Sequence, residues 1–182
     1  MMEQDLNQFL ASVERKAYRM AQIALVNHAD ALDVVQETMI KLAQKYSHRP
    51  SSEWKPLFYR ILETRLLDWH RHQAVHNRLF AWLGRSDDNK EDSVIDVYES
   101  VHITSSYESP ENKLRSQQAI KKLDDALQKL PLRQQQAFLL RHWEELSVEE
   151  TALVMNCSEG SVKTHFSRAV HSLREQLEEC WP

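Results

Sequence analysis

Apolar residues recur at steps of three and four through residues 6–46, which is the spacing of one face of an α-helix. The stretch Asn27–Asp30 interrupts this pattern, so we expect two successive helices. The apolar face expected for the second helix consists of Leu32, Val35, Met39 and Leu42. Asp33, Gln36 and Glu37 point away from that face on the helical repeat and would leave a polar surface free for a partner.

The pattern changes twice in the middle of the chain. Ser47–Ser52 predicts a loop, and Pro56 fits the first turn of a third helix that runs toward Ala74. Residues 86–113 then mix acidic with small polar residues, and their few apolar positions keep no helical period. We interpret this range as a flexible acidic linker, near whose end Pro110 favours the start of the next helix.

The last third of the chain carries clear helix start signals. Pro131 begins a helix over residues 131–145, and Ser147 with Glu150 forms the capping-box pattern that opens another. Ser158 supplies a further N-cap after a tight turn at residues 156–157. The apolar face expected for the final helix consists of Val162, Phe166, Ala169, Val170, Leu173 and Leu177. A short helix, a tight turn and a longer helix are typical of a helix-turn-helix.

The composition agrees with a helical chain. Its 182 residues include only 2 glycines and 5 prolines, which leaves few turn signals for β-hairpins. The length suits two small units as well as one ordinary domain. We predict an all-α fold with two small helical domains, residues 1–85 and residues 114–182, joined by the acidic linker.

The charge is distributed unevenly along the chain, although the total is only −4. Residues 1–85 carry 12 basic and 9 acidic side chains, residues 86–113 carry 2 and 8, and residues 114–182 carry 9 and 10. This profile permits DNA binding through local basic surfaces, but few phosphates are neutralised together. We therefore expect weak DNA binding by the free protein and a second protein that supplies much of the affinity.

The outward side of the final helix offers a compact hydrogen-bonding surface. Its side chains are Ser161, Lys163, Thr164, Ser167 and Arg168. A helix with such a surface fits the major groove of DNA with its amino end first. Helical hairpins are common, however, and the same residues also fit an ordinary solvent-facing surface, so the spacing alone leaves both interpretations open.

Residues 53–78 interleave aromatic and basic side chains. The aromatic residues are Trp54, Phe58, Tyr59 and Trp69, and the basic residues are Lys55, Arg60, Arg65, Arg71 and Arg78. Aromatic rings stack on bases and cations hold phosphates, which suits single-stranded DNA. Taken alone, the segment is better explained by a core helix with a solvated basic face, because aromatic residues at helical spacing are usually core residues.

Several function classes have no residues to support them. We find no phosphate-binding glycine loop, no nucleophile elbow and no paired carboxylates, so the sequence predicts neither an enzyme nor a small-molecule substrate. His70, His72 and His76 could suggest a metal site, but His70 and His72 fall on different sides of a helix and no cysteine or carboxylate completes a site, so we expect no metal and no cofactor. Without a signal-peptide pattern or an apolar run of about 20 residues, we expect a cytoplasmic protein without direct membrane contact.

Three segments together resemble one protein family. Residues 130–177, which contain the helix-turn-helix, resemble region 4 of sigma-70-family factors, especially the extracytoplasmic-function (ECF) group. The segment DALDVVQETMIKLAQKY resembles the region 2 helix that docks on the coiled coil of the largest polymerase subunit, and LFYRILETRLLDWHRH resembles the promoter-reading helix that follows it. The resemblance spans residues 8–80 and 114–178.

This resemblance implies an alternative sigma factor that binds core RNA polymerase, through its coiled coil and flap, and directs promoter-specific initiation. Asp33, Gln36 and Glu37 would contact the polymerase. The residues implied at the minus-10 element are Trp54, Lys55, Phe58, Tyr59, Arg60, Thr64, Arg65, Asp68, Trp69 and Arg71. Those implied at the minus-35 element are Ser161, Lys163, Thr164, Ser167 and Arg168, with Arg141 against a phosphate. The family also implies control by an anti-sigma factor.

The sequence departs from the family pattern at two of these positions and leaves two other functions open. Thr64 stands where the family often has asparagine, and Trp54 where it has a shorter aromatic residue, so the minus-10 base preference is not transferred. A stand-alone regulator that binds operators as a dimer explains the helix-turn-helix but leaves Asp33 and its neighbours without a role. An adaptor that binds polymerase or an anti-sigma factor without reading DNA is the other alternative.

Overall fold

The computed structural model describes residues 2–25, 27–82 and 110–177, and within these ranges every regular element is helical. The first half contains α1 (Met2–Leu25), α2 (His28–Tyr46) and α3 (Ser51–Trp82). The second half contains α4 (Pro110–Lys129), α5 (Leu132–Phe138), the π-helical turn η2 (Leu139–Trp143), α6 (Val148–Met155) and α7 (Glu159–Leu177). The predicted all-α class is confirmed. Residues 83–109 lie outside the described residues, and they include most of the predicted linker, 86–113.

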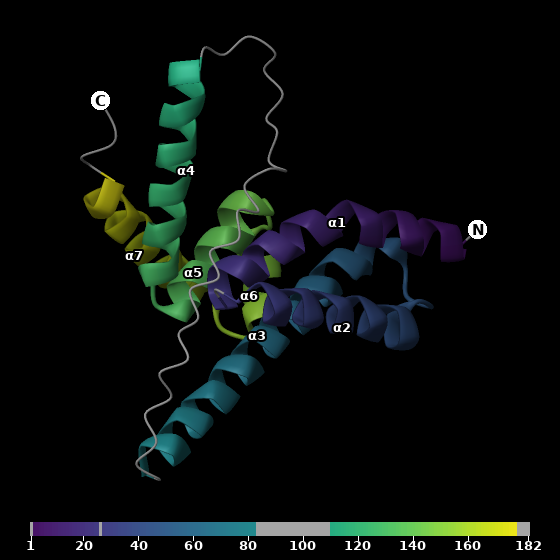
Figure 1. Ribbon diagram of the computed structural model, residues 1–182. Helices are drawn as coiled ribbons and strands as arrows, with labels where there is room; N and C mark the ends of the chain where they lie inside the picture. The colour runs from purple at the N-terminus through teal and green to yellow at the C-terminus, as the bar shows by residue number, and fades with distance from the viewer. Residues whose placement is uncertain (1, 26, 83–109, 178–182) are drawn as a thin grey trace.

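Helices α1, α2 and α3 pack on one another, with α2 in contact with both of its neighbours (Figure 1). The Asn27 side chain caps α2 by accepting hydrogen bonds from the amides of Ala29 and Asp30, at 2.8 and 3.2 Å. The buried residues of α2 are Ala31, Val34, Val35, Thr38 and Leu42. The predicted apolar face is therefore wrong at Leu32, which is 38% exposed. Helices α1 and α3 cover the side of α2 that carries the small residues Ala31 and Thr38, and Leu32 lies outside that side.

Helix α3 begins at Ser51, within the predicted loop, and continues past Ala74 to Trp82. Pro56 lies in its second turn, where it removes only the hydrogen bond that its amide would donate to the carbonyl of Ser52. Ser52 is exposed, so water can satisfy that carbonyl and the helix is not broken. The carboxyl-terminal half of α3 extends away from the rest of the molecule (Figure 1).

Helices α6 and α7 form the predicted helix-turn-helix. The Ser147 hydroxyl accepts a hydrogen bond from the amide of Glu150 at 3.1 Å, and the Glu150 carboxylate accepts one from the amide of Ser147 at 2.7 Å, which confirms the capping box. Asn156 ends α6 in the left-handed region at φ 50°, and Ser158 caps α7 by accepting from the amide of Ser161 at 3.1 Å. Helices α4, α5 and α6 all pack against α7.

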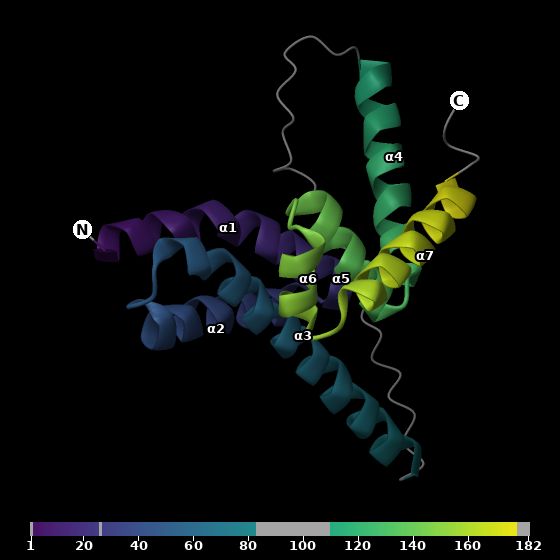
Figure 2. The same ribbon diagram turned by 180° about the vertical axis from the view of Figure 1, so that it is seen from behind.

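The predicted helix over residues 131–145 is interrupted. Helix α5 ends at Phe138, and the wider turn η2 follows before the chain reverses at Glu145, whose φ is 56°. This path buries Leu139 and Leu140 and directs Glu144 toward the first half of the chain. The two halves pack together, with α6 on α3 and α4 near the end of α1 (Figure 2).

Candidate nucleic-acid interface

The solvent-facing side of α2 carries the three residues expected to contact polymerase. Asp33, Gln36 and Glu37 are all exposed. The same side also exposes Leu32 and Ile40, the latter at 54%, which the sequence analysis did not include. Positions 32, 36 and 40 follow a four-residue step, and that spacing was the signal that would have placed them on one side. We call these five residues the α2 surface.

The polar side chains of α3 lie beside the α2 surface. Arg65 forms an ion pair with Glu37 at 3.3 Å. A residue predicted to contact the minus-10 element therefore touches one predicted to contact the polymerase. Asp68 pairs with Arg71 one turn further along, also at 3.3 Å. Arg60, Thr64 and Arg71 are exposed, and the Thr64 hydroxyl donates to the carbonyl of Arg60 at 2.7 Å.

Three of the aromatic residues predicted to meet DNA are core residues. Trp54 is 2% exposed, and Phe58 and Tyr59 are fully buried. Phe9 packs on two of them, with ring centroids 5.8 Å from Trp54 and 6.2 Å from Phe58. A ring enclosed in this way has no face on which a base can stack, so the predicted DNA contact of these three residues is corrected. Trp69 is partly exposed and packs edge to face with its neighbour His70.

Tyr59 has a further polar environment within the core. Burial raises the pKa of its hydroxyl, and the neighbouring Glu144 and Glu63 carboxylates raise that pKa further. The Tyr59 hydroxyl therefore remains protonated throughout the physiological range.

The outward side of α7 presents four of the predicted minus-35 residues to solvent. These exposed residues are Lys163, Thr164, Ser167 and Arg168. Val162, Ala169 and Leu173 are buried on the opposite side, as their spacing predicted. Ser161 is only half exposed, because it completes the cap of α7. The arrangement gives α7 a continuous polar surface above a buried apolar one.

Arg141 lies apart from this surface. It is half-buried, its guanidinium donates to the carbonyl of Leu146, and the group also lies 5.9 Å from the centroid of the Phe166 ring. These contacts hold the turn between η2 and α6 against α7. A guanidinium has five N–H donors, so the bond to Leu146 leaves others that could meet a phosphate. The phosphate contact of Arg141 stays a prediction.

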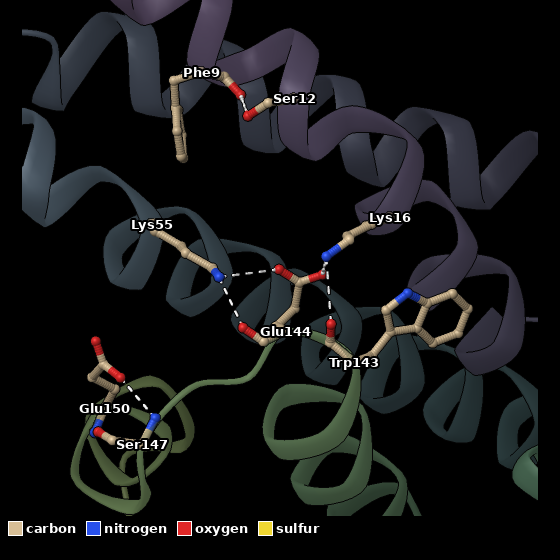
Figure 3. A network of polar contacts seen from close by, with 8 residues as sticks. All are labelled: Phe9, Ser12, Lys16, Lys55, Trp143, Glu144, Ser147 and Glu150. Carbon is tan, nitrogen blue, oxygen red and sulfur yellow. Dashed lines mark hydrogen bonds and ion pairs between the residues drawn. The ribbon is translucent and has the colours of Figure 1, made fainter.

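Glu144 connects the two halves of the chain (Figure 3). It is 2% exposed, and its carboxylate forms ion pairs with Lys16 of α1 at 3.5 Å and Lys55 of α3 at 3.6 Å. Lys55 also donates to the backbone carbonyl of Glu144 at 2.8 Å, and Lys16 donates to that of Trp143 at 3.4 Å. Sequence reasoning missed this cluster because its members lie far apart in the chain and share no local pattern.

A second buried acid lies where α3 meets α5. Glu63 is 2% exposed, and burial raises its pKa to about 8, although the nearby Gln136 side chain and the charge of Arg133 oppose the shift. Both opposing residues belong to α5, in the other half of the chain. Near neutral pH the Glu63 side chain is therefore largely protonated.

Raising the pH from 6 to 8 should lower the free energy of unfolding by about 2 kcal/mol through Glu63. Its pKa is about 8 in the folded chain against an ordinary 4.5, so the folded chain keeps a proton that the unfolded chain has lost. The stabilisation is complete below pH 4.5 and is lost as the pH rises through 8. Urea unfolding at pH 6, 7 and 8 measures it. Glu63→Gln should flatten this slope while the exposed Glu14→Gln keeps it, and a slope unchanged in Glu63→Gln would contradict the assignment.

Two further features of the described ranges concern ligands and membranes. In 2–25, 27–82 and 110–177, no three His, Cys, Asp or Glu side chains come together as a group that would hold a metal ion. His72 and His76 are exposed along α3 and His70 is half-buried. Among the same residues, no helix has both the length and the apolar character needed to cross a bilayer.

Comparison with known proteins identifies both halves. The family model for sigma-70 region 2 matches residues 6–76, and the model for sigma-70 region 4 matches residues 120–173. The first match covers α1, α2 and most of α3, and the second covers the helix-turn-helix with part of α4. The two matches occur in the order that the sequence resemblance implied.

Relatives that match along most of the chain include two sigma factors. The RNA polymerase sigma factor SigV of Bacillus subtilis is 30% identical, and the match covers 88% of this chain and 83% of SigV. The ECF RNA polymerase sigma-E factor of Salmonella typhimurium is 26% identical, and the match covers 96% of this chain and 88% of that protein. Two Streptomyces sigma-E factors are 46% identical over 56 residues, so that match spans 31% of their length. The fold is similar to that of the sigma factor RpoE from Bartonella quintana, crystallised with the anti-sigma factor NepR, at a TM-score of 0.69 and 23% identity over 96% of this chain and 98% of that one. The chain therefore belongs to the sigma-70 family of RNA polymerase sigma factors, in its extracytoplasmic-function group.

Proposed function

We propose that this protein is an alternative sigma factor that binds core RNA polymerase and directs initiation at a specific class of promoters. Sigma factors are transcription initiation factors, and the polymerase carries out the chemistry. The observation that carries the proposal is that one chain exposes partner-facing side chains in both of its family regions, on α2 in region 2 and on α7 in region 4. A regulator that used the helix-turn-helix alone would leave the α2 surface without a role.

The α2 surface supports the polymerase contact. Protein interfaces combine a few apolar anchors with a polar rim, and Leu32 and Ile40 lie here beside Asp33, Gln36 and Glu37. Exposed apolar side chains on an amphipathic helix pack well against another helix. We assign the α2 surface to the coiled coil of the largest polymerase subunit, and region 4 to the flap.

The DNA contacts are assigned to the exposed residues of α3 and α7. On α3, we assign the exposed basic side chains Arg60 and Arg71 to phosphates and the half-buried Trp69 to a base of the single-stranded minus-10 element. On α7, Lys163 and Arg168 supply the donors that contact guanine edges and phosphates in the major groove of the minus-35 element. We propose 1–85 and 114–182 as the two functional domains.

An anti-sigma factor is proposed as the regulator of this chain. The support is the similarity in fold to a sigma factor crystallised with an anti-sigma factor. The two halves of the present chain pack against each other, with α6 on α3. A protein that stabilised this packing would restrict access to the part of α3 that α6 covers. Isolating proteins bound to the full chain in its native host tests this part of the proposal.

The central test is assembly with core polymerase. We expect the wild-type chain to co-purify with bacterial core polymerase and to give promoter-specific transcripts, and Asp33→Lys with Gln36→Lys to weaken assembly by about tenfold or more, because complementary charge is replaced by repulsion. This pair leaves the Glu37–Arg65 ion pair intact. The control, Gln8→Lys with Glu14→Lys, makes the same charge change at exposed positions of α1.

Each outcome of this experiment decides a separate statement. If the wild-type chain does not bind core polymerase, the proposed function is wrong. If the wild-type chain binds and the α2 variant assembles as well as the α1 control, the assignment of the α2 surface is wrong while the function stands.

A further inference from the structure

The surfaces assigned to the two promoter elements lie close together in this structure. Arg60 of α3 and Glu159, the first residue of α7, border the same shallow hollow, together with Leu153 and Asn156 of the helix-turn-helix. Promoter elements centred about 25 base pairs apart are about 85 Å apart on duplex DNA, which rises about 3.4 Å per base pair. A compact chain of this length has a radius of gyration of only about 16 Å. If the proposed function is right, the two halves must separate before both elements are contacted.

The charged contacts that oppose this separation include the ion pair of Arg19 in α1 with Asp124 in α4 and the cluster around Glu144, in which one carboxylate meets two lysines. Lys16 and Lys55 are each roughly half exposed, whereas the Glu144 side chain is 2% exposed. Exposed ion pairs contribute little, but this cluster combines two ion pairs to a buried carboxylate with two charge-assisted hydrogen bonds from the same lysines to backbone carbonyls. Both lysines lie in the first half and Glu144 lies in the second, so the halves cannot part without breaking these contacts.

The local backbone holds Glu144 in this position. The turn η2 precedes it, the left-handed residue Glu145 follows it, and the capping box of Ser147 and Glu150 fixes the chain immediately afterwards (Figure 3). The loop therefore presents the carboxylate of Glu144 toward α1 and α3 from a short, well-anchored segment.

We propose that Glu144 is an intramolecular latch, which docks region 4 on Lys16 and Lys55 in the free protein and is released when the protein engages both promoter elements. Lys55 is among the residues that the family resemblance implies at the minus-10 element, so the latch also occupies a cation that DNA would use. The carboxylate of Glu144 takes the place that a backbone phosphate would take against this lysine, because both are anionic oxygen acceptors. Release of the latch frees Lys55 and the neighbouring surface of α3 at the same time.

The separation of the halves can be measured without any assay of function. In a Cys157→Ser, Cys180→Ser background, spin labels on Gln44→Cys of α2 and Gln128→Cys of α4, both exposed, report one distance between the halves by pulsed electron resonance. We expect a single narrow distribution for the otherwise unchanged chain and a longer, broader one for Glu144→Lys. Glu145→Lys changes the same charge at the next, exposed residue and should leave the distribution unchanged.

Two more variants separate loss of the latch from loss of folding. Lys16→Glu breaks the same contact from the other side at a half-exposed position, and it should also lengthen the distance. Combining Lys16→Glu, Lys55→Glu and Glu144→Lys inverts every charge and should restore the narrow distribution. Circular dichroism of each variant checks that the helices remain. Distances in Glu144→Lys and Lys16→Glu that equal those of Glu145→Lys would overturn the latch.

Transcription with core polymerase distinguishes the latch from the function on which it rests. We expect Glu144→Lys to raise the rate of promoter complex formation roughly three- to tenfold over Glu145→Lys, because less of the chain is closed. If the wild-type chain does not bind polymerase at all, the proposed function fails, and the distance measurement still decides the latch. If polymerase binds but neither the distances nor the rates differ between these two variants, the latch alone is wrong.

Discussion

Phe58→Ala should lower the free energy of unfolding by about 3–5 kcal/mol, the usual effect of removing a fully buried phenyl ring. The ring is 0% exposed and packs edge to face on Phe9 and Tyr59, with centroids 6.2 and 5.3 Å away. Truncation would leave a cavity beneath α1 and α3 that neighbouring side chains fill only in part. Urea unfolding followed by circular dichroism measures the change.

A more conservative substitution, Phe58→Leu, tests whether Phe58 has any direct role on DNA. Phe58→Leu keeps most of the buried volume, so it should lose far less stability than Phe58→Ala and should keep the affinity for single-stranded minus-10 DNA in the holoenzyme. Trp69→Ala, at a partly exposed ring, should lower that affinity and have the smaller effect on unfolding. A Phe58→Leu protein that folds normally but loses DNA binding would show that the core assignment is incomplete.

Replacing Lys163 and Arg168 of α7 together with alanine should weaken holoenzyme binding to its promoter by about 100-fold, since each contact with a base edge or phosphate contributes about 1–3 kcal/mol. Both side chains are exposed on the polar surface of α7, so their removal should not disturb the buried residues Val162, Ala169 and Leu173. Promoter affinity measured across a range of salt concentrations tests this expectation, and the salt dependence should become shallower.

The matched control removes one lysine and one arginine elsewhere in region 4. Lys129→Ala in the last turn of α4 and Arg174→Ala in the last turn of α7 are both exposed and lie outside the assigned surface. We expect this pair to change promoter affinity far less than the α7 pair. Equal losses in the two pairs would mean that only total charge matters, and the assignment of Lys163 and Arg168 to the minus-35 element would be wrong. Transcription that is unaffected by the α7 pair would have the same consequence.

The amino-acid sequence by itself determined the helical class, the helix-turn-helix and most helix starts. These features depend on residues within one or two turns of each other: Asn27 accepts from amides two and three residues away, and Ser147 and Glu150 cap α6 reciprocally. The buried stripe of α7 also follows from its own repeat. Local hydrogen bonds and helical periodicity are nearly independent of what packs on the helix, so a linear pattern is sufficient to predict them.

Only the tertiary structure decided which of the chemically suitable side chains are available to a partner. The pattern of α3 is compatible with base stacking although it favours core packing, and contact with Phe9 of α1 buries Trp54 and Phe58. Leu32 becomes exposed because two neighbouring helices set the buried side of α2. Glu144 meets Lys16 only because η2 and Glu145 turn the chain toward the other half. Burial and charge pairing depend on residues distant in the chain, and no local repeat encodes which of them come together.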